Sequence, residues 1–231
     1  MRRQSQPGSG YGEKGERTTE QEVLNYMEGI YINELFWLLS AIKSNCEKLF
    51  EIAKVPETGY IIQVNLEVHS LIKSIVNDSS HLANLIDPST KKKDESEEHY
   101  RFRKERGEYL RKIFAGIIVE EILQKKLRNS IEHFDERLDN LVHLVSKKAR
   151  IKNQMLAHNM VFSERAVLQP FPLPVRVYVS SEKKFYNMNW QINIGKIFTE
   201  CISMLNAMKN LERLKRIEEP GGMIVIIPKI P

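Results

Sequence analysis

The sequence predicts a mainly α protein: an antiparallel bundle of four to five helices with a small C-terminal α+β extension. Apolar residues recur near a period of 3.6 through most of residues 19–147, as they do in amphipathic helices. The helical segments are joined by short loops, which favours an up-down bundle. After residue 150 the pattern changes, and at about 175–194 apolar and polar residues alternate, which is typical of strands with one buried face.

Length and composition indicate one globular core with a small appendage. The chain has 231 residues, 42% of them hydrophobic and 28% charged. No apolar run approaches the roughly 20 residues of a membrane helix, and no apolar segment follows the charged start of the chain as it would in a signal peptide. We therefore expect a cytoplasmic protein without a membrane partner. The net charge of +5 only weakly supports a polyanionic partner.

The first half of the chain is expected to be helical after a disordered tail. Residues 1–18 are rich in Gly, Ser, Gln and charge, so they cannot bury enough apolar surface to order. A helix should begin at 19, where Thr18 and Gln21 have capping-box spacing, and end before Pro56 and Gly59. Its Cys46, like Cys201 later in the chain, is interpreted as a small buried hydrophobe.

Three further helical segments complete the predicted bundle over residues 19–150. The second helix runs from about Tyr60 to Leu85 and is followed by an exposed polar loop. The third begins near Glu97 and could continue through Leu123, with Gly107 and Gly116 as weak points. The fourth carries an amphipathic pattern beyond Lys125 to Lys147.

Residues 151–231 are expected to form the α+β extension, packed on the bundle. A proline-rich connector at 169–174 is extended, because each proline restricts the residue before it. A hairpin is predicted at about 175–194, then a helix at about 196–217. The turn at Gly221-Gly222 leads into a predicted terminal strand at 223–227.

The segment with the most chemical content is Arg128-Asn129-Ser130-Ile131-Glu132-His133, on the fourth predicted helix. An Arg followed by a His after four to six residues is a weak pattern, since chance supplies about one copy in this chain. It occurs twice, at Arg128 with His133 and at Arg137 with His143. Only the first has a polar residue, Asn129, directly after the arginine, which lowers the chance expectation to about 0.02.

With its flanks, this motif resembles uncharacterised bacterial proteins of the HEPN superfamily. The run from Leu127 to Asp139 is similar to a stretch of those proteins, and Arg106-Gly107-Glu108-Tyr109 is similar to an Arg-Gly segment that they carry. The resemblance covers roughly residues 60–146 and implies a HEPN-like bundle. Residues 150–231 resemble nothing that we recognise.

The resemblance implies a metal-independent endoribonuclease, a toxin or defence effector, that acts as a homodimer and uses no cofactor. His133 would be the general base on the RNA 2′-hydroxyl, because imidazole titrates near neutral pH. Arg128 would stabilise charge on the phosphorus, and Asn129 would position the phosphate or the imidazole. A cognate antitoxin or another protein partner is implied as well.

Other interpretations remain open. Positively and negatively charged residues are dense around His133, as they are on a salt-bridged surface. The chain could therefore be a non-catalytic HEPN-like scaffold for protein partners, or it could bind RNA without cleaving it. The basic residues of the third helix are weaker candidates for substrate binding: Arg101, Arg103, Arg106 and Arg111. His69 is interpreted as a core or surface residue, and no spacing predicts a zinc site.

Overall fold

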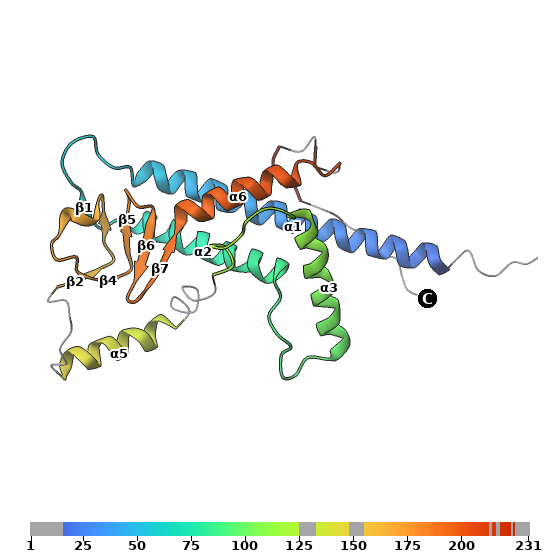
Figure 1. Ribbon diagram of the computed structural model, residues 1–231, viewed down its shortest axis with the longest axis horizontal. Coiled ribbons are helices and arrows are strands. Elements are labelled where there is room, and N and C mark those ends of the chain that lie inside the picture. The colour runs from blue at the N-terminus through green and yellow to red at the C-terminus, as the bar shows by residue number, and fades with distance from the viewer. Residues whose placement is uncertain are drawn as a thin grey trace, which may run out of the picture.

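The computed structural model describes residues 16–124, 133–147, 155–212, 214–215, 218–222 and 224. Within them the fold is α+β, with five α-helices and a mixed five-stranded sheet built mainly from the C-terminal part. Figure 1 shows the N-terminal part as helical, with the strands gathered at one end of the long helices. The predicted mainly α class therefore underestimated the sheet, although the helical N-terminal half is confirmed.

Three helices, α1, α2 and α6, make up the central helical layer. They span Glu16–Ile52, Leu66–Ile86 and Ile194–Met208. α1 packs against the other two, which both run opposite to it (Figure 1). Side chains at helical spacing close the interface by burying their apolar surface; those of α1 and α2 that are almost wholly inaccessible include Leu35, Leu39, Ile42, Leu49, Ile72, Ile75 and Leu82.

The boundaries of α2 and α6 differ from the predicted ones because asparagine side chains cap them. The Asn65 side chain accepts a hydrogen bond from the Val68 amide at 3.2 Å, so α2 begins at Leu66, and the predicted start near Tyr60 is wrong. Asn193 accepts from the Lys196 amide at 3.0 Å, which starts α6 at Ile194. The predicted helix at 196–217 ends early, at Met208.

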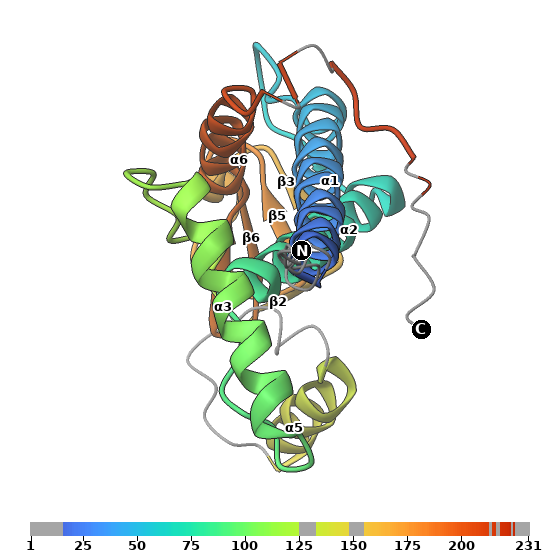
Figure 2. The same cartoon turned by 90° about the vertical axis from the view of Figure 1, so that its right-hand side faces the viewer.

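Helix α3, Glu97–Ile113, packs against α2 (Figure 2). It passes through Gly107, where a Cβ atom would lie 2.5 Å from Cδ of Pro88 and 3.2 Å from the carbonyl oxygen of Ile86. Only glycine allows this close approach. The predicted continuation to Leu123 is wrong, because the chain leaves the helix after Ile113 and adopts a left-handed conformation at Gly116, with φ +83°.

The non-helical segment after α3 is held by a buried carboxylate of α6. Glu200 accepts hydrogen bonds from the backbone amides of Glu120, Glu121 and Ile122 at 2.8 to 3.0 Å. The Glu121 carboxylate in turn accepts from the Asn193 amide at 2.6 Å. These bonds satisfy backbone groups that a loop would otherwise bury without partners.

The main sheet has the strand order β1-β3-β5-β6-β7 and mixes parallel and antiparallel pairs. β3 pairs parallel with β5, and the other neighbours are antiparallel. The strands are β1 Ile62–Gln63, β3 Val161–Phe162, β5 Val177–Val179, β6 Lys184–Asn187 and β7 Trp190–Asn193. A separate parallel pair joins β2, Leu156–His158, to β4, Leu173–Val175, and a 3₁₀ turn, Arg165–Val167, lies between β3 and β4.

Both faces of the main sheet are covered. Tyr178, Phe185 and Ile192 belong to the large core shared with α1, α2 and α6. Val177 and Val179, on the opposite face of β5, belong to a second apolar cluster with Phe162 and Tyr186. The prediction of strands with one buried face is therefore wrong for β5, whose three residues are all buried.

The predicted hairpin at 175–194 is in fact three antiparallel strands preceded by a separate strand. Arg176 has a left-handed backbone, with φ +57°, which separates β4 from β5. The chain then reverses again at Met188, with φ +55°, and Asn187 pairs with Trp190. Across a two-residue turn, an odd-numbered residue pairs with an even-numbered one, so the parity of the buried positions changes. The alternation of residue types in the sequence continues through Met188 without such a change, and it therefore does not reveal the turn.

Helix α5, Phe134–Ser146, lies apart from the helical layer, below the strands in Figure 1. None of its residues, all of which are described, is buried. The third member of the helical layer is thus α6, and the predicted bundle position of the fourth helix is wrong. The predicted strand at 223–227 lies outside the described residues except for Ile224, which is in no strand and is 97% exposed.

Candidate functional site

The predicted catalytic motif is only partly described. Arg128 and Asn129 lie outside the described residues, so their arrangement with His133 stays a prediction. His133 precedes the first turn of α5, with φ −103° and ψ +38°, rather than lying inside a helix. Its side chain is 59% exposed, and Nδ1 lies 3.6 Å from Oε1 of Glu136. An accessible imidazole beside a carboxylate is therefore present at this end of α5.

Contacts of the first turns of α5 place His133 near the sheet. The guanidinium carbon of Arg176 lies 3.5 Å from the ring centroid of Phe134, the residue after His133. The guanidinium carbon of Arg137 lies 5.7 Å from the ring of Trp190 on β7. Both are cation–π contacts, and they bring the N-terminal end of α5 beside the junction of β4 and β5.

The four candidate arginines of α3 have a different setting. Arg103 makes a bidentate ion pair with Glu95, with both N–O distances 2.6 Å, and its hydrogen bonds lower the pKa of Glu95 to about 2. Arg106 donates to the carbonyl of Asn84 at 3.0 Å, and Arg111 donates to that of Gly107 at 3.4 Å. Arg101 is exposed on the same helix.

The contacts of Arg103 and Arg106 join α3 to segments that precede it in the chain, and Figure 1 separates α3 from α5. The structure therefore does not bring the four arginines together with His133. Their role in substrate binding stays a prediction.

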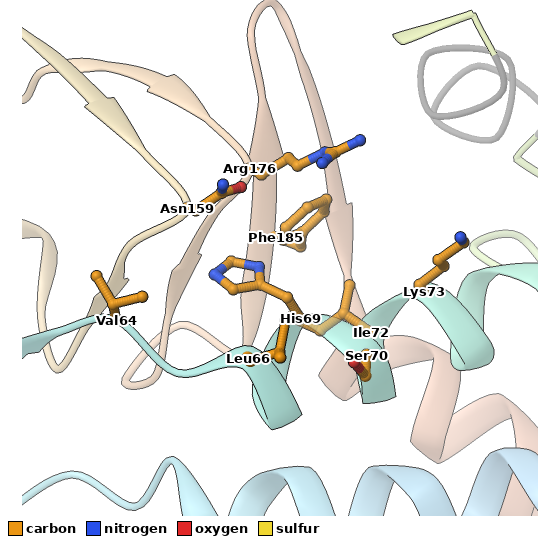
Figure 3. A pocket seen from close by; sticks show the side chains of 9 residues that line it. All are labelled: Val64, Leu66, His69, Ser70, Ile72, Lys73, Asn159, Arg176 and Phe185. Atoms are coloured by element: carbon orange, nitrogen blue, oxygen red, sulfur yellow. The ribbon is translucent and has the colours of Figure 1, made fainter.

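A pocket of about 340 Å³ opens where the start of α2 faces the sheet (Figure 3). From α2 it is lined at helical spacing by Leu66, His69, Ser70 and Lys73, with Ile72 beside them. Val64, Asn159, Arg176 and Phe185 complete the wall. Arg176 stands at the junction of β4 and β5; it lines this pocket, and its guanidinium contacts Phe134.

His69 is the chemically distinctive residue of this pocket. Its ring donates a hydrogen bond to the backbone carbonyl of Asn159 and meets Phe185 edge-on at 6.3 Å between centroids. Burial lowers the pKa of His69, opposed by that hydrogen bond, and the nearby Arg176 lowers it further. Its Nε2 is buried without a hydrogen-bond partner among the described residues. The neutral ring therefore keeps a buried acceptor atom without a partner among these residues.

The pocket is electropositive on its described walls. Lys73 and Arg176 are the charged residues among those lining it, and no carboxylate is among them. Burial lowers the pKa of Arg176. The start of α2 adds the positive end of its dipole. An anionic ligand would complement all three.

Sequence reasoning missed this pocket. It interpreted His69 as a core or surface residue, and it placed Arg176 within the predicted hairpin at about 175–194. One signal was available, since a histidine interrupts the apolar stripe of α2. Arg176 could not have been found in that way, because its position depends on a left-handed residue between two strands.

No protein-family model, no curated protein and no solved structure matches the chain. Within the residues that the structure describes, no cluster of three or more His, Cys, Asp or Glu side chains could hold a metal ion. The described helices also include none long and apolar enough to cross a membrane. The resemblance to HEPN proteins thus stays a prediction from the motif.

Proposed function

We propose that the protein is a metal-independent endoribonuclease of HEPN type, with the site at Arg128, Asn129 and His133. His133 removes the proton from an RNA 2′-hydroxyl, and the resulting oxygen attacks the adjacent phosphorus. The P–O5′ bond breaks, leaving a 2′,3′-cyclic phosphate, and the departing 5′ oxygen takes a proton from water. Arg128 stabilises charge on the phosphate oxygens, and Asn129 positions the phosphate or the imidazole.

The motif carries this proposal, and the setting of His133 supports it. Its imidazole is accessible and lies 3.6 Å from Glu136, which can orient the ring for proton transfer. Arg176 lines the electropositive pocket and contacts Phe134, the residue after His133, so the pocket lies near this imidazole. A phosphodiester chain that reaches His133 would therefore have a cationic surface next to it.

The test is cleavage of a labelled single-stranded RNA in EDTA by the wild type, His133→Ala and His143→Ala. His143 is the matched control, because it lies on the same helix, is exposed and belongs to the second Arg–His pair. We expect cleavage by the wild type and His143→Ala, and a loss of about 100-fold or more in His133→Ala. Equal cleavage by His133→Ala, or none by the wild type, would contradict the proposal.

The homodimer belongs to the same proposal, because catalytic relatives of this type line one cleft with two motifs. Solution mass by light scattering tests it. A protein that cleaves RNA while remaining a monomer at the assay concentration would remove the second copy from the mechanism.

A second candidate is a non-catalytic scaffold for protein partners, favoured by the apolar surface of α5. Val142, Leu144 and Val145 are each at least 50% exposed on that helix. Exposed apolar groups in proximity are typical of interaction surfaces. A stable complex in cells together with no RNA turnover in vitro would favour this candidate over the ribonuclease.

A further inference from the structure

The pocket between α2 and the sheet combines features that suit a nucleotide. Its volume of about 340 Å³ lies at the small end of the roughly 300–1,000 Å³ range of small-molecule sites. Its walls come from α2, β6 and two strand junctions, which belong to or adjoin the packed core. Such a pocket is preorganised for a ligand, because core elements hold its walls.

One end of the pocket suits a phosphate. Arg176 brings a partly buried guanidinium that lies over the face of the Phe134 ring. Lys73 adds a second cation from α2. Guanidinium and ammonium groups beside the start of a helix form a common setting for phosphate recognition.

The other features suit a nucleoside. Val64 is 72% exposed and Leu66 is 80% exposed, while Phe185 is buried in the wall. These apolar groups can cover a nucleobase, whose flat faces prefer apolar or aromatic contacts. The ring of His69 forms part of the wall between these two ends, where a sugar would lie.

Backbone strain marks the same place. Asn159 and Arg176 both have left-handed backbones, with φ +55° and +57°, and both line the pocket. The Asn159 amide donates to the carbonyl of Val175 at 2.9 Å, which joins the two strained positions. Strained residues of this kind cluster at binding sites, where the surrounding structure holds them.

We propose that this pocket binds one ribonucleotide, with its phosphate at Arg176 and Lys73, its sugar at His69 and its base against Val64, Leu66 and Phe185. The nucleotide is either a free mononucleotide or one residue of an RNA chain. Only the second source rests on the proposed ribonuclease function. In that case the pocket holds a residue beside the one cleaved at His133, because Phe134 joins the two places.

The test measures binding of uridine and adenosine 5′-monophosphates to the full chain by calorimetry, beside the two nucleosides and inorganic phosphate. We expect at least one mononucleotide to bind about tenfold or more tightly than its nucleoside or phosphate alone, since both ends contribute. Mononucleotides have no phosphodiester to cleave, so this measurement stands even if the protein cleaves nothing. Absence of mononucleotide binding, or phosphate binding as tightly, overturns the proposal.

Two pairs of variants locate the binding. Ser70→Glu puts a carboxylate on the exposed pocket wall, and Ser70→Gln is its uncharged control of the same size. We expect Ser70→Glu to weaken binding about tenfold or more and Ser70→Gln to keep it within about twofold. Arg176→Gln should weaken binding to a similar degree, while Lys209→Gln, which removes an exposed charge at the end of α6, should not. Equal loss in Ser70→Gln or Lys209→Gln overturns the assignment.

The source of the nucleotide is found with a single-stranded RNA hexamer and the His133→Ala protein, which avoids cleavage. Competition of the hexamer with the mononucleotide, lost in Ser70→Glu, supports an RNA residue in the pocket. Mononucleotide binding without competition supports a free nucleotide. If the wild type cleaves RNA and Ser70→Glu cleaves it equally well, the pocket has no part in that reaction.

Discussion

α2 and α5 carry similar amphipathic patterns in the sequence, yet the structure treats them differently. α2 buries nine residues and packs against both α1 and α3, whereas α5 buries none. Leu138 and Leu141 of α5 border a shallow apolar hollow beside β2 and β4, and Val142 is 58% exposed. An amphipathic pattern thus predicts that a helix forms, but burial depends on what the rest of the chain places against it.

The residues that stabilise the fold and the residues proposed to act chemically lie in different places. The helical layer of α1, α2 and α6 holds the large core, while the proposed chemical groups lie at its edge, at the start of α2 and the start of α5. His69 and His133 are each within four residues of a helix start. Such positions place a side chain at the edge of the core while core residues of neighbouring turns fix the backbone.

The largest expected effect concerns the core side of this comparison. Leu39→Ala, in the wholly buried part of α1, should lower the free energy of unfolding by about 2–5 kcal/mol, because it removes buried methyl groups and leaves a cavity. Val142→Ala on α5 should change it by no more than about 0.5 kcal/mol. Urea denaturation measures both, and equal losses would show that α5 is packed more tightly than its exposure indicates.

A smaller effect is expected where the core holds the segment that follows α3. Glu200→Gln replaces a carboxylate oxygen with an amide nitrogen that faces backbone amides, so we expect a loss of about 1–3 kcal/mol in unfolding free energy. Glu105→Gln, at an exposed position of α3, is the control and should lie within about 0.5 kcal/mol of the wild type. An unchanged stability in Glu200→Gln would mean that these three hydrogen bonds do not hold the segment.

The smallest effect is a pH dependence at the edge of the core. Burial lowers the pKa of His69 below its usual value of 6.5, so the unfolded chain binds a proton more readily than the folded one. The stability that neutral His69 contributes is fully present above pH 6.5. It is lost as the pH falls from 6.5 through the lowered pKa of His69 in the folded protein. The wild type should therefore lose more stability between pH 7 and pH 5 than His69→Gln does, in thermal or urea unfolding. Parallel losses in the two proteins would show that His69 is solvated in the folded state.

Local patterns were enough to predict much of the helical half. The 3.6-residue period located most of α1, α2 and α3, and the polar stretch before Glu97 was a loop as expected. The predicted helix ends were less accurate. Asn65 and Asn193 start their helices by accepting hydrogen bonds from nearby amides, and the left-handed Gly116 turns the chain away after α3. Those ends depend on one or two residues, which a periodic pattern averages over.

The site was predictable only in part. The motif around His133 is contiguous in sequence, so its residue types could be read directly, although Arg128 and Asn129 lie outside the described residues. The pocket at His69 joins residues that are far apart in the chain, including Asn159 and Arg176. No local pattern relates such positions, since only strand pairing and helix packing bring them together.

By itself, the sequence determined that the N-terminal half is helical, that strands lie within about 175–194, and that the chain carries an Arg-Asn-x3-His motif at 128–133. The physical reason is that helices, strands and short motifs depend on neighbours within a few residues. Only the tertiary structure decided that α6 rather than α5 completes the helical layer, that both faces of β5 are buried, and that His69 and Arg176 share a pocket. These outcomes depend on which surfaces meet, and apolar burial is non-directional, so a pattern of apolar residues does not name its partner.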